Sequence, residues 1–203
     1  MEPLIPGYYY HIYNHVNGNE QLFREEKNYY FFLKKFKQHI IPVADIFAYC
    51  LMPNHFHFLL RLTEKVELQT LESFPKFRTL EKSDFDVSQL EKLTGDYISK
   101  QFSNMFSSYT QAYNRMYNRR GSLFIKNFRR KRIHDENYFI KVVNYIHFNP
   151  VTHGFVDKPA DWKFSSYNAI VSHKKTMLKR DEVLEWFGGL ANFMVCHLRP
   201  MDI

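Results

Sequence analysis

Two apolar runs joined by a Pro-Asn pair constrain the fold of this chain more than any other feature. Residues 43–52 (VADIFAYCLM) and 55–62 (HFHFLLRL) flank Pro53-Asn54, a pair typical of a tight turn. Their length, aromatic content and partial alternation predict the two strands of a β-hairpin. Runs this short can also belong to a buried helix, which stays open as the alternative.

The segments before this hairpin predict one strand and one helix. Residues 7–16 (GYYYHIYNHV) are rich in aromatic side chains and are followed by an Asn-Gly-Asn turn signal, so we predict a first strand there. In residues 23–40, apolar side chains recur at spacings of three, four and seven among lysines. This pattern predicts an amphipathic helix that is closed by Pro42.

Further helices are predicted after the hairpin. In residues 97–118, aromatic and apolar side chains lie at alternating offsets of four and three, so they share one helical stripe. Residues 136–148 form the next predicted helix, with Asp135 as its N-cap and Asn149-Pro150 at its end. A short peripheral helix is expected at residues 181–187.

The size and composition of the chain predict one core with additions. With 203 residues, 45% of them hydrophobic, the chain is long enough for one ordinary domain and short for two. We assign residues 1–170 to one domain with an insertion at about 64–96, and residues 171–203 to a C-terminal helical extension. Cys50 and Cys196 are too few for a disulfide scaffold, and neither a signal-peptide pattern nor a membrane-length apolar run is present. We therefore expect a cytoplasmic protein with no membrane partner.

The net charge of +7 is unevenly distributed. Residues 64–96 hold eight acidic and five basic side chains, whereas residues 115–134 hold eight basic side chains and no acidic one. The basic run predicts a surface that follows the phosphates of a nucleic acid, and Phe124 and Phe128 within it are candidates for stacking on unpaired bases. The candidate phosphate ligands are Arg115, Arg119, Arg120, Lys126, Arg129, Arg130, Lys131 and Arg132. A solvated hairpin face is the alternative.

A histidine pair lies in the second strand of the predicted hairpin. His55 and His57 are separated by one residue, so on a strand both imidazoles project from the same face. Two adjacent imidazoles suit a divalent metal ion. The pair lacks the cysteine spacing of a zinc finger and the His-Glu-x-x-His context of a metalloprotease, and Leu59 stands where a histidine-triad hydrolase would need a third histidine.

A second pair of polar side chains lies on the helix predicted at residues 136–148. Tyr145 and Asn149 are four residues apart and so share one face of this helix. A phenol can accept a phosphoryl group, and an amide oxygen one turn away can complete the coordination of a metal ion. The alternative is structural: Tyr145 packs among apolar neighbours and Asn149 caps a turn.

Taken together, these motifs resemble a known family. Residues 49–60 (YCLMPNHFHFLL) closely resemble the His-hydrophobic-His signature of the single-tyrosine HUH transposases, the insertion sequence 200-like family. Residues 145–151 (YIHFNPV), Gly154 and residues 162–167 (WKFSSY) are similar to the branch known as REP-associated tyrosine transposases. The resemblance covers most of residues 7–167.

The resemblance implies a compact α+β fold, an antiparallel sheet with packed helices of the ferredoxin-like or RRM-like type. Carried over position by position, it makes His55 and His57 metal ligands, Asn149 the third ligand and Tyr145 the nucleophile. With Mg²⁺ or Mn²⁺, such a protein cleaves and rejoins single-stranded, hairpin-containing DNA through a 5′-phosphotyrosine intermediate. It acts as a monomer or a homodimer, which decides whether the tyrosine serves its own metal site or a partner's.

Several alternatives stay open at this stage. Tyr138, seven residues before Tyr145, is a second candidate nucleophile, and Lys141 is a candidate for lowering the pKa of the phenol. His147 is expected to play a structural or phosphate-contacting role. The acidic segment 64–96 departs from the family pattern and is expected to be a lid, an autoinhibitory flap or a partner surface.

Two rival functions also remain. A domesticated descendant would bind DNA hairpins without cleaving them. An RNA-binding regulator would instead stack bases on exposed strand aromatics such as Tyr8, Tyr9 and Tyr10.

Overall fold

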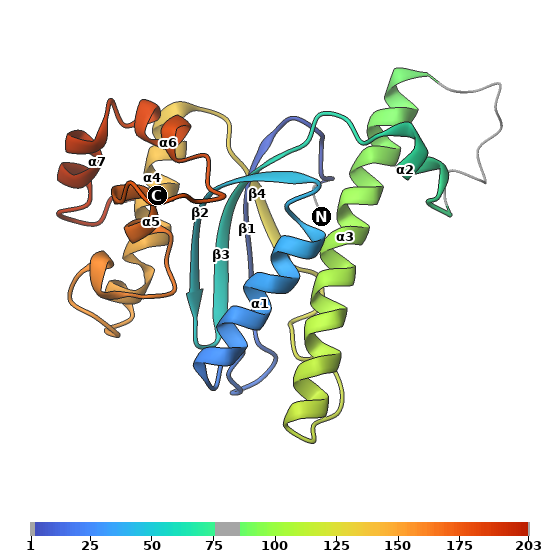
Figure 1. The fold of residues 1–203 in the computed structure, drawn as a ribbon, viewed down its shortest axis with the longest axis horizontal. Coiled ribbons are helices and arrows are strands. Elements are labelled where there is room, and N and C mark those ends of the chain that lie inside the picture. Colours follow the sequence, from blue (N-terminus) through green and yellow to red (C-terminus); the bar gives the residue numbers. More distant parts are fainter. Residues whose placement is uncertain (1–2, 76–85, 203) are drawn as a thin grey trace.

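A four-stranded sheet lies at the centre of the structure, a computed structural model that describes residues 3–75 and 86–202 (Figure 1). The strand order is β2-β3-β1-β4, so β3 and β1 are the inner strands, and each neighbouring pair is antiparallel. The strands are β1 (Tyr9–His15), β2 (Ala44–Met52), β3 (His55–Leu62) and β4 (Arg129–Arg132). The predicted α+β class, with helices packed on an antiparallel sheet, is confirmed.

The two apolar runs form the predicted hairpin. β2 pairs with β3 from Met52 opposite His55 onward, and Pro53-Asn54 forms the turn between them. Nearly every side chain of β3 is buried, whichever face it points to. The hairpin therefore needs a cover of helices on both of its faces, which explains why the alternation of polar and apolar residues in its sequence is only partial.

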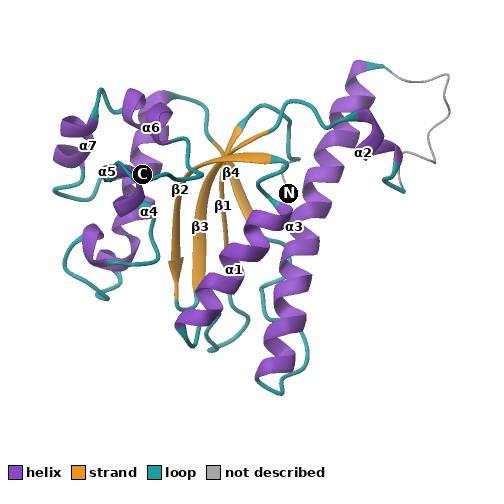
Figure 2. Ribbon diagram, in the orientation of Figure 1, coloured by secondary structure: helices purple, strands orange, loops and turns teal. Residues whose placement is uncertain are grey.

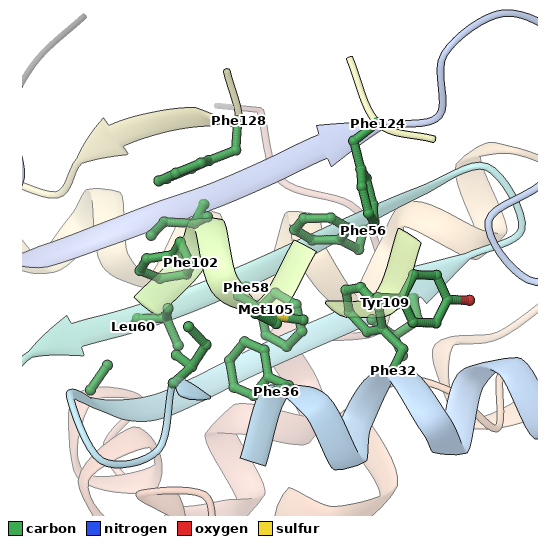
Figure 3. Close-up of a cluster of buried hydrophobic side chains, with 14 of the residues drawn as sticks. Phe32, Phe36, Phe56, Phe58, Leu60, Phe102, Met105, Tyr109, Phe124 and Phe128 are labelled. Atoms are coloured by element: carbon green, nitrogen blue, oxygen red, sulfur yellow. The ribbon is translucent and has the colours of Figure 1, made fainter. Parts of the chain in front are cut away.

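Helices α1 (Glu26–His39) and α3 (Val87–Met116) cover one face of the sheet (Figures 1 and 2). Each buries one stripe of side chains at helical spacing against the strands. These side chains and those of the strands interlock in one aromatic cluster (Figure 3). Its central members are Phe32 and Phe36 from α1, Phe56 and Phe58 from β3, and Phe102, Met105 and Tyr109 from α3.

Phe124 and Phe128 belong to this same cluster, so the prediction that they stack on bases is wrong. Their side chains are only 6% and 8% exposed. Both rings lie against Phe106 of α3, at centroid distances of 5.0 and 5.6 Å. They hold the segment that leads to β4 on the core, and that segment presents its basic side chains instead.

Helix α3 begins ten residues earlier than predicted. Asp86 caps it, because the Asp86 carboxylate accepts a hydrogen bond from the backbone N–H of Gln89 at 2.8 Å. The first turns are polar and only weakly periodic, but Leu93 is buried, so tertiary packing supports a helix that the local pattern does not reveal. The first turns of α3 and helix α2 (Leu68–Glu72) both lie in the acidic segment 64–96. Residues 76–85 of that segment lie outside the described residues.

Helix α4 (Glu136–Thr152) packs on the other face of the sheet, against β2 and β3. Its apolar side chains Val142, Val143 and Ile146 join a second cluster with Phe47 and Leu59. The C-terminal elements gather around this helix, on the left in Figure 1. They are a short 3₁₀ turn (Pro159–Asp161), α5 (Tyr167–Val171), α6 (Arg180–Trp186) and α7 (Leu190–Cys196).

One end of α4 was predicted correctly and the other was not. Asp135 is the N-cap, and its carboxylate accepts a hydrogen bond from the backbone N–H of Tyr138 at 2.8 Å. The helix does not stop at Asn149-Pro150, since it continues to Thr152. Pro150 lacks an N–H and so removes one hydrogen bond, but the N–H of His153 still donates to the Asn149 carbonyl at 3.1 Å. Asn149 therefore lies inside a helical turn that holds its side chain.

Candidate functional site

The histidine pair of β3 points toward α4. Phe56 and Phe58, which alternate with the histidines, lie in the cluster under α1 and α3. Leu59, on the same alternation as His55 and His57, lies in the cluster under α4. Both histidine side chains are therefore on the α4 face, as predicted, and each is only 3% exposed.

Helix α4 brings Asn149 between the two imidazoles. The Nε2 atom of His55 lies 2.7 Å from Oδ1 of Asn149, and the Nε2 atom of His57 lies 3.3 Å from Nδ2 of the same amide. One turn earlier, the ring of Tyr145 stands edge-on to that of His57, at a centroid distance of 5.4 Å. The four residues chosen from the sequence thus meet within a single chain.

Strand β1 adds a histidine that the sequence reading missed. Nε2 of His11 lies 2.9 Å from Nδ1 of His57, and His11 is buried. His15, on the same alternation of β1, stacks on His55 at a centroid distance of 4.5 Å. Every second residue from His11 to His15 is aromatic, and this alternation was the sequence signal that these rings share one face of a strand. Only the pairing of β1 with β3 shows that this face is the one that carries the site.

The buried histidines of the site are neutral at physiological pH. Burial lowers the pKa of His55 to about 4 and that of His11 to about 3, and it lowers the pKa of His57 well below the ordinary value. At His55 the amide oxygen of Asn149, which can accept from a protonated ring, opposes this effect only in part. Neutral imidazoles keep one ring lone pair free, which a metal ligand requires.

Hydrogen-bond partners limit where the ring protons can lie. Amide oxygens face both ring nitrogens of His55, because Oδ1 of Asn54 lies 2.7 Å from Nδ1 and Oδ1 of Asn149 lies 2.7 Å from Nε2. A neutral ring carries one proton, so only one of these two contacts can be a hydrogen bond. The Asn149 amide donates to Nε2 of His57, so His57 carries its proton on Nδ1 and donates it to His11. With the His55 proton on Nδ1, both Nε2 lone pairs are directed at Asn149.

This arrangement leaves one contact without a proton. If the His55 proton is on Nδ1, the Nε2 lone pair faces Oδ1 of Asn149 at 2.7 Å and neither atom can donate; if it is on Nε2, the contact with Asn54 is the one without a proton. Two imidazole nitrogens and one amide oxygen that converge in this way fit a divalent cation, which would replace the repulsion by coordination. In the described part of the chain, no group of three or more His, Cys, Asp or Glu side chains is arranged to hold a metal ion. The candidate ligand set of two neutral imidazoles and one amide contains no carboxylate and is therefore neutral.

Tyr145 lies beside the candidate ligands, whereas Tyr138 packs against Lys131 at the start of the helix. Tyr145 is half-buried, and burial raises the pKa of its phenol while a hydrogen bond from Asn149 lowers it. Tyr138 lies in the first turn of α4, where the Lys131 ammonium group stands 4.6 Å from its ring centroid. Lys141 is exposed. Only Tyr145 combines contact with His57 and with the candidate ligand Asn149.

The predicted basic surface divides between the two faces of β4. Arg129 and Lys131 pair with Tyr13 and His11 of β1, so they lie on the face of the site, and both are exposed. Arg130 and Arg132 point to the opposite face. Their guanidinium groups lie over the rings of Phe128 and Tyr8, at 5.1 and 3.4 Å from the ring centroids.

Arg119 does not fit the role of a phosphate ligand. Its Nε donates to both carboxylate oxygens of Glu20, at 2.8 and 2.6 Å. Its remaining nitrogens donate to the side chain of Asn114 and to the carbonyls of Gly121 and Ser122. These bonds fix the turn after α3. Arg115, Arg120 and Lys126 are exposed and remain candidates.

The strand aromatics do not form a platform for bases. Tyr10 is fully buried, and Tyr9 packs edge-on against Phe47, Phe139 and Trp186. Only Tyr8 is exposed, and Arg132 covers its ring. The arrangement therefore does not favour the RNA-binding alternative, which needs exposed rings on the sheet.

Helix α2, in the acidic segment, lies away from the site. In Figure 1 it packs beside the start of α3, at the upper right, whereas the β2–β3 turn next to His55 is at the lower end of the sheet. The basic segment after α3 begins at that lower end too. Helix α2 therefore does not cover the histidines or Tyr145.

Comparisons with known proteins agree with the resemblance seen in the motifs. No family model matches the sequence. Over 122 residues, the chain is 24% identical to a Haemophilus influenzae protein provisionally described as a REP-associated tyrosine transposase, and the match covers 60% of this chain. It spans only 57% of the length of that relative.

A solved structure shares the fold. It is described as a REP-associated tyrosine transposase bound to a REP hairpin, and the two chains superpose with a TM-score of 0.52 at 20% sequence identity. The superposition covers 85% of this chain and 84% of the other. The resemblance to REP-associated tyrosine transposases is confirmed, and at this identity the structural likeness speaks for the fold alone. Among the described helices, none is both long and apolar enough to cross a membrane.

Proposed function

We propose that this chain is a metal-dependent tyrosine endonuclease and strand transferase that acts on single-stranded, hairpin-containing DNA. The observation that carries the proposal is the meeting of Tyr145 and Asn149 from α4 with His55 and His57 from β3. Two imidazole nitrogens and one amide oxygen that converge beside a phenol are ligand types that suit a divalent cation. The similarity to REP-associated tyrosine transposases, one of them bound to a REP hairpin, supports the same conclusion.

Each residue of the site has a role in this proposal. His55, His57 and Asn149 would hold Mg²⁺ or Mn²⁺, which would polarise the scissile phosphate and stabilise the charge on its oxygens. Asn54 and His11 keep the Nδ1 protons of the two histidines occupied, so that Nε2 stays free for coordination. Because the ligand set is neutral, we expect weak metal binding that the DNA phosphate completes.

The reaction exchanges one phosphate ester for another. The Tyr145 oxygen attacks phosphorus and loses its proton, the bond to the 3′ oxygen breaks, and that oxygen takes up a proton. The DNA is left with a 5′-phosphotyrosine link and a free 3′-hydroxyl. The reverse attack by a 3′-hydroxyl rejoins a strand without ATP, because the energy of the ester bond is conserved.

The exposed basic side chains would hold the DNA backbone. Arg129 and Lys131 lie on the site face of β4, and the exposed Lys126 follows α3. Contacts to phosphates position a nucleic acid but carry no sequence code. The hairpin specificity of this chain therefore has to come from other contacts or from DNA shape.

The direct test is a covalent-adduct assay. The protein is incubated with labelled single-stranded hairpin oligonucleotides and Mn²⁺, and adducts are separated on a denaturing gel. We expect an adduct with the wild type and with Tyr138→Phe, and none with Tyr145→Phe or His57→Ala. An adduct that survives Tyr145→Phe would show that the nucleophile is another residue. Hairpin binding without any adduct, whatever the metal, would favour the rival function of a protein that binds DNA hairpins without cleaving them.

A further inference from the structure

A buried chain of hydrogen bonds ties α4 to the C-terminal helix α7 and to β2, away from the histidine pair. Nδ1 of His147 lies 2.9 Å from Nε2 of His197, and Nε2 of His147 lies 2.7 Å from Oγ of Ser166. His197 in turn reaches the carbonyl of Phe193 through Nδ1, at 2.8 Å. Ser166 accepts from the backbone N–H of Tyr49 in β2, also at 2.8 Å.

The ring protons of His147 and His197 have one consistent arrangement. The Phe193 carbonyl only accepts, so His197 carries its proton on Nδ1 and accepts through Nε2. His147 must then donate through Nδ1 and accept through Nε2 from the Ser166 hydroxyl at 2.7 Å. That hydroxyl also lies 3.2 Å from the Tyr49 carbonyl, which is the longer of its two contacts. Because Ser166 is also bonded to the backbone of β2, the chain sets α4 against the sheet that carries the site histidines.

Asn144 makes a second tie to the same C-terminal segment. Its amide nitrogen donates to the carbonyls of Cys196 and Arg199, at 2.8 and 3.2 Å. Its amide oxygen accepts from the backbone N–H of Met201 at 2.8 Å. Asn144 and His147 are both fully buried. Residues 190–201 are therefore bound to α4 at two points, about one helical turn apart.

The ties control the rotation of α4. Successive residues of a helix are about 100° apart, so Asn149 lies on roughly the opposite side of the axis from His147. A rotation or slide that moved Asn149 away from His55 would have to break the bonds of His147 or of Asn144. An unpaired buried donor is costly, so the helix is held in one orientation.

We propose that residues 190–201 form a clamp that positions α4, with Asn144, His147 and His197 as positioning residues, so that Tyr145 and Asn149 meet the histidine pair. This inference rests on the proposed function, and it assigns the C-terminal segment a part in that function. None of the three residues touches the ligand atoms. They act through the helix that carries Asn149 and Tyr145.

The test uses the full chain and two substitutions at one position. His197→Phe keeps an aromatic ring in place but cannot accept from His147, whereas His197→Gln keeps an acceptor. Mn²⁺ affinity is measured without DNA by electron paramagnetic resonance, hairpin affinity by fluorescence anisotropy, and the rate of adduct formation at saturating DNA by single-turnover kinetics. Met194→Ala, an exposed position of α7, is the control for changes in this helix.

We expect His197→Phe to weaken Mn²⁺ binding about tenfold and to slow adduct formation at least as much, because a misplacement of about 1 Å can cost on the order of a hundredfold in rate. Hairpin affinity should stay within about twofold, since the basic side chains lie elsewhere. His197→Gln and Met194→Ala should stay near the wild type. If His197→Phe does not fold, Asn144→Ala replaces it in the same comparison.

The inference is overturned if folded His197→Phe and Asn144→Ala proteins bind Mn²⁺ and form the adduct as the wild type does. A merely structural clamp would lower the melting temperature and leave both readouts unchanged at a temperature where the protein is folded. If the wild type itself binds no Mn²⁺ and forms no adduct, the proposed function is wrong, and the clamp loses its purpose with it.

Discussion

The two sides of α4 carry histidine clusters that differ in one respect. In the clamp, every ring nitrogen of His147 and His197 has a complementary partner. In the site, the neutral ring of His55 has one proton for two amide oxygens, those of Asn54 and Asn149, so one contact lacks a proton. Both clusters are buried and neutral, so burial and pKa do not separate them. The difference is the match of donors and acceptors, and a buried mismatch is where a ligand is expected.

The largest effect is expected when Tyr145 and His57 are substituted in different copies of the chain. Because Asn149 and Tyr145 reach the histidines of their own chain, each chain should build a complete site. A mixture of Tyr145→Phe and His57→Ala proteins should then form no adduct, even at high protein concentration. Recovery of the adduct on mixing would show that the tyrosine acts on a partner's site. The wild type diluted with either variant is the control for inhibition.

The same substitution at the two asparagines of α4 should have opposite effects. Asn149→Asp puts a carboxylate between the site histidines, which should tighten Mn²⁺ binding about tenfold or more. Asn144→Asp puts a carboxylate against the carbonyls of Cys196 and Arg199. It should lower the free energy of unfolding by about 3 kcal/mol, measured by urea denaturation.

Equal effects of Asn149→Asp and Asn144→Asp would show that the two asparagines do not differ in role. If Asn149→Asp destabilised the fold as much as Asn144→Asp and left Mn²⁺ affinity unchanged, Asn149 would be a structural residue.

The hydrogen-bond partners of the candidate metal ligands should matter less than the candidate ligands themselves. His11→Phe removes the acceptor for the Nδ1 proton of His57, and Asn54→Ala removes that of His55. Each change should weaken Mn²⁺ binding about 10- to 100-fold, measured by titration calorimetry. His39→Phe, a histidine in the last turn of α1, should have no effect. Unchanged affinity in both variants would mean that the proton positions assigned here do not control the site.

The smallest effect is expected for the two faces of β4. Lys131→Gln removes an exposed charge next to the site, and it should weaken hairpin binding a few-fold and reduce its salt dependence by about one counterion. Arg132→Gln, on the opposite face, removes a guanidinium that covers Tyr8, and it should change hairpin affinity less. The reverse order, measured by anisotropy at several salt concentrations, would place the DNA on the other face of the strand.

The sequence was sufficient for features that depend on local spacing. The turn at Pro53-Asn54 and the alternation around His55 and His57 predicted the hairpin and the shared face. The four-residue spacing of Tyr145 and Asn149 predicted that they would share one side of α4. Such features need only the period of a strand or a helix, which neighbouring residues determine.

Features that depend on distant partners could not be read in this way. His11 joins the site only because β1 pairs with β3. Arg119 does not belong to the basic surface, because its guanidinium group binds Glu20, 99 positions away. The core, and not the local sequence, decides that Phe124 and Phe128 are buried. The end of α4 was also missed, because a proline can occupy the last turn of a helix at the cost of one hydrogen bond.

We expect a divalent metal ion to bind between His55, His57 and Asn149, and not at the His147–His197 cluster on the other side of α4. The direct measurement is nuclear magnetic resonance of the protein with ¹⁵N-labelled histidine, recorded while Mn²⁺ is added. We predict that the Nε2 signals of His55 and His57 broaden first, while those of His147 and His197 persist. Equal persistence of all four, or earlier loss of the clamp signals, would contradict the account.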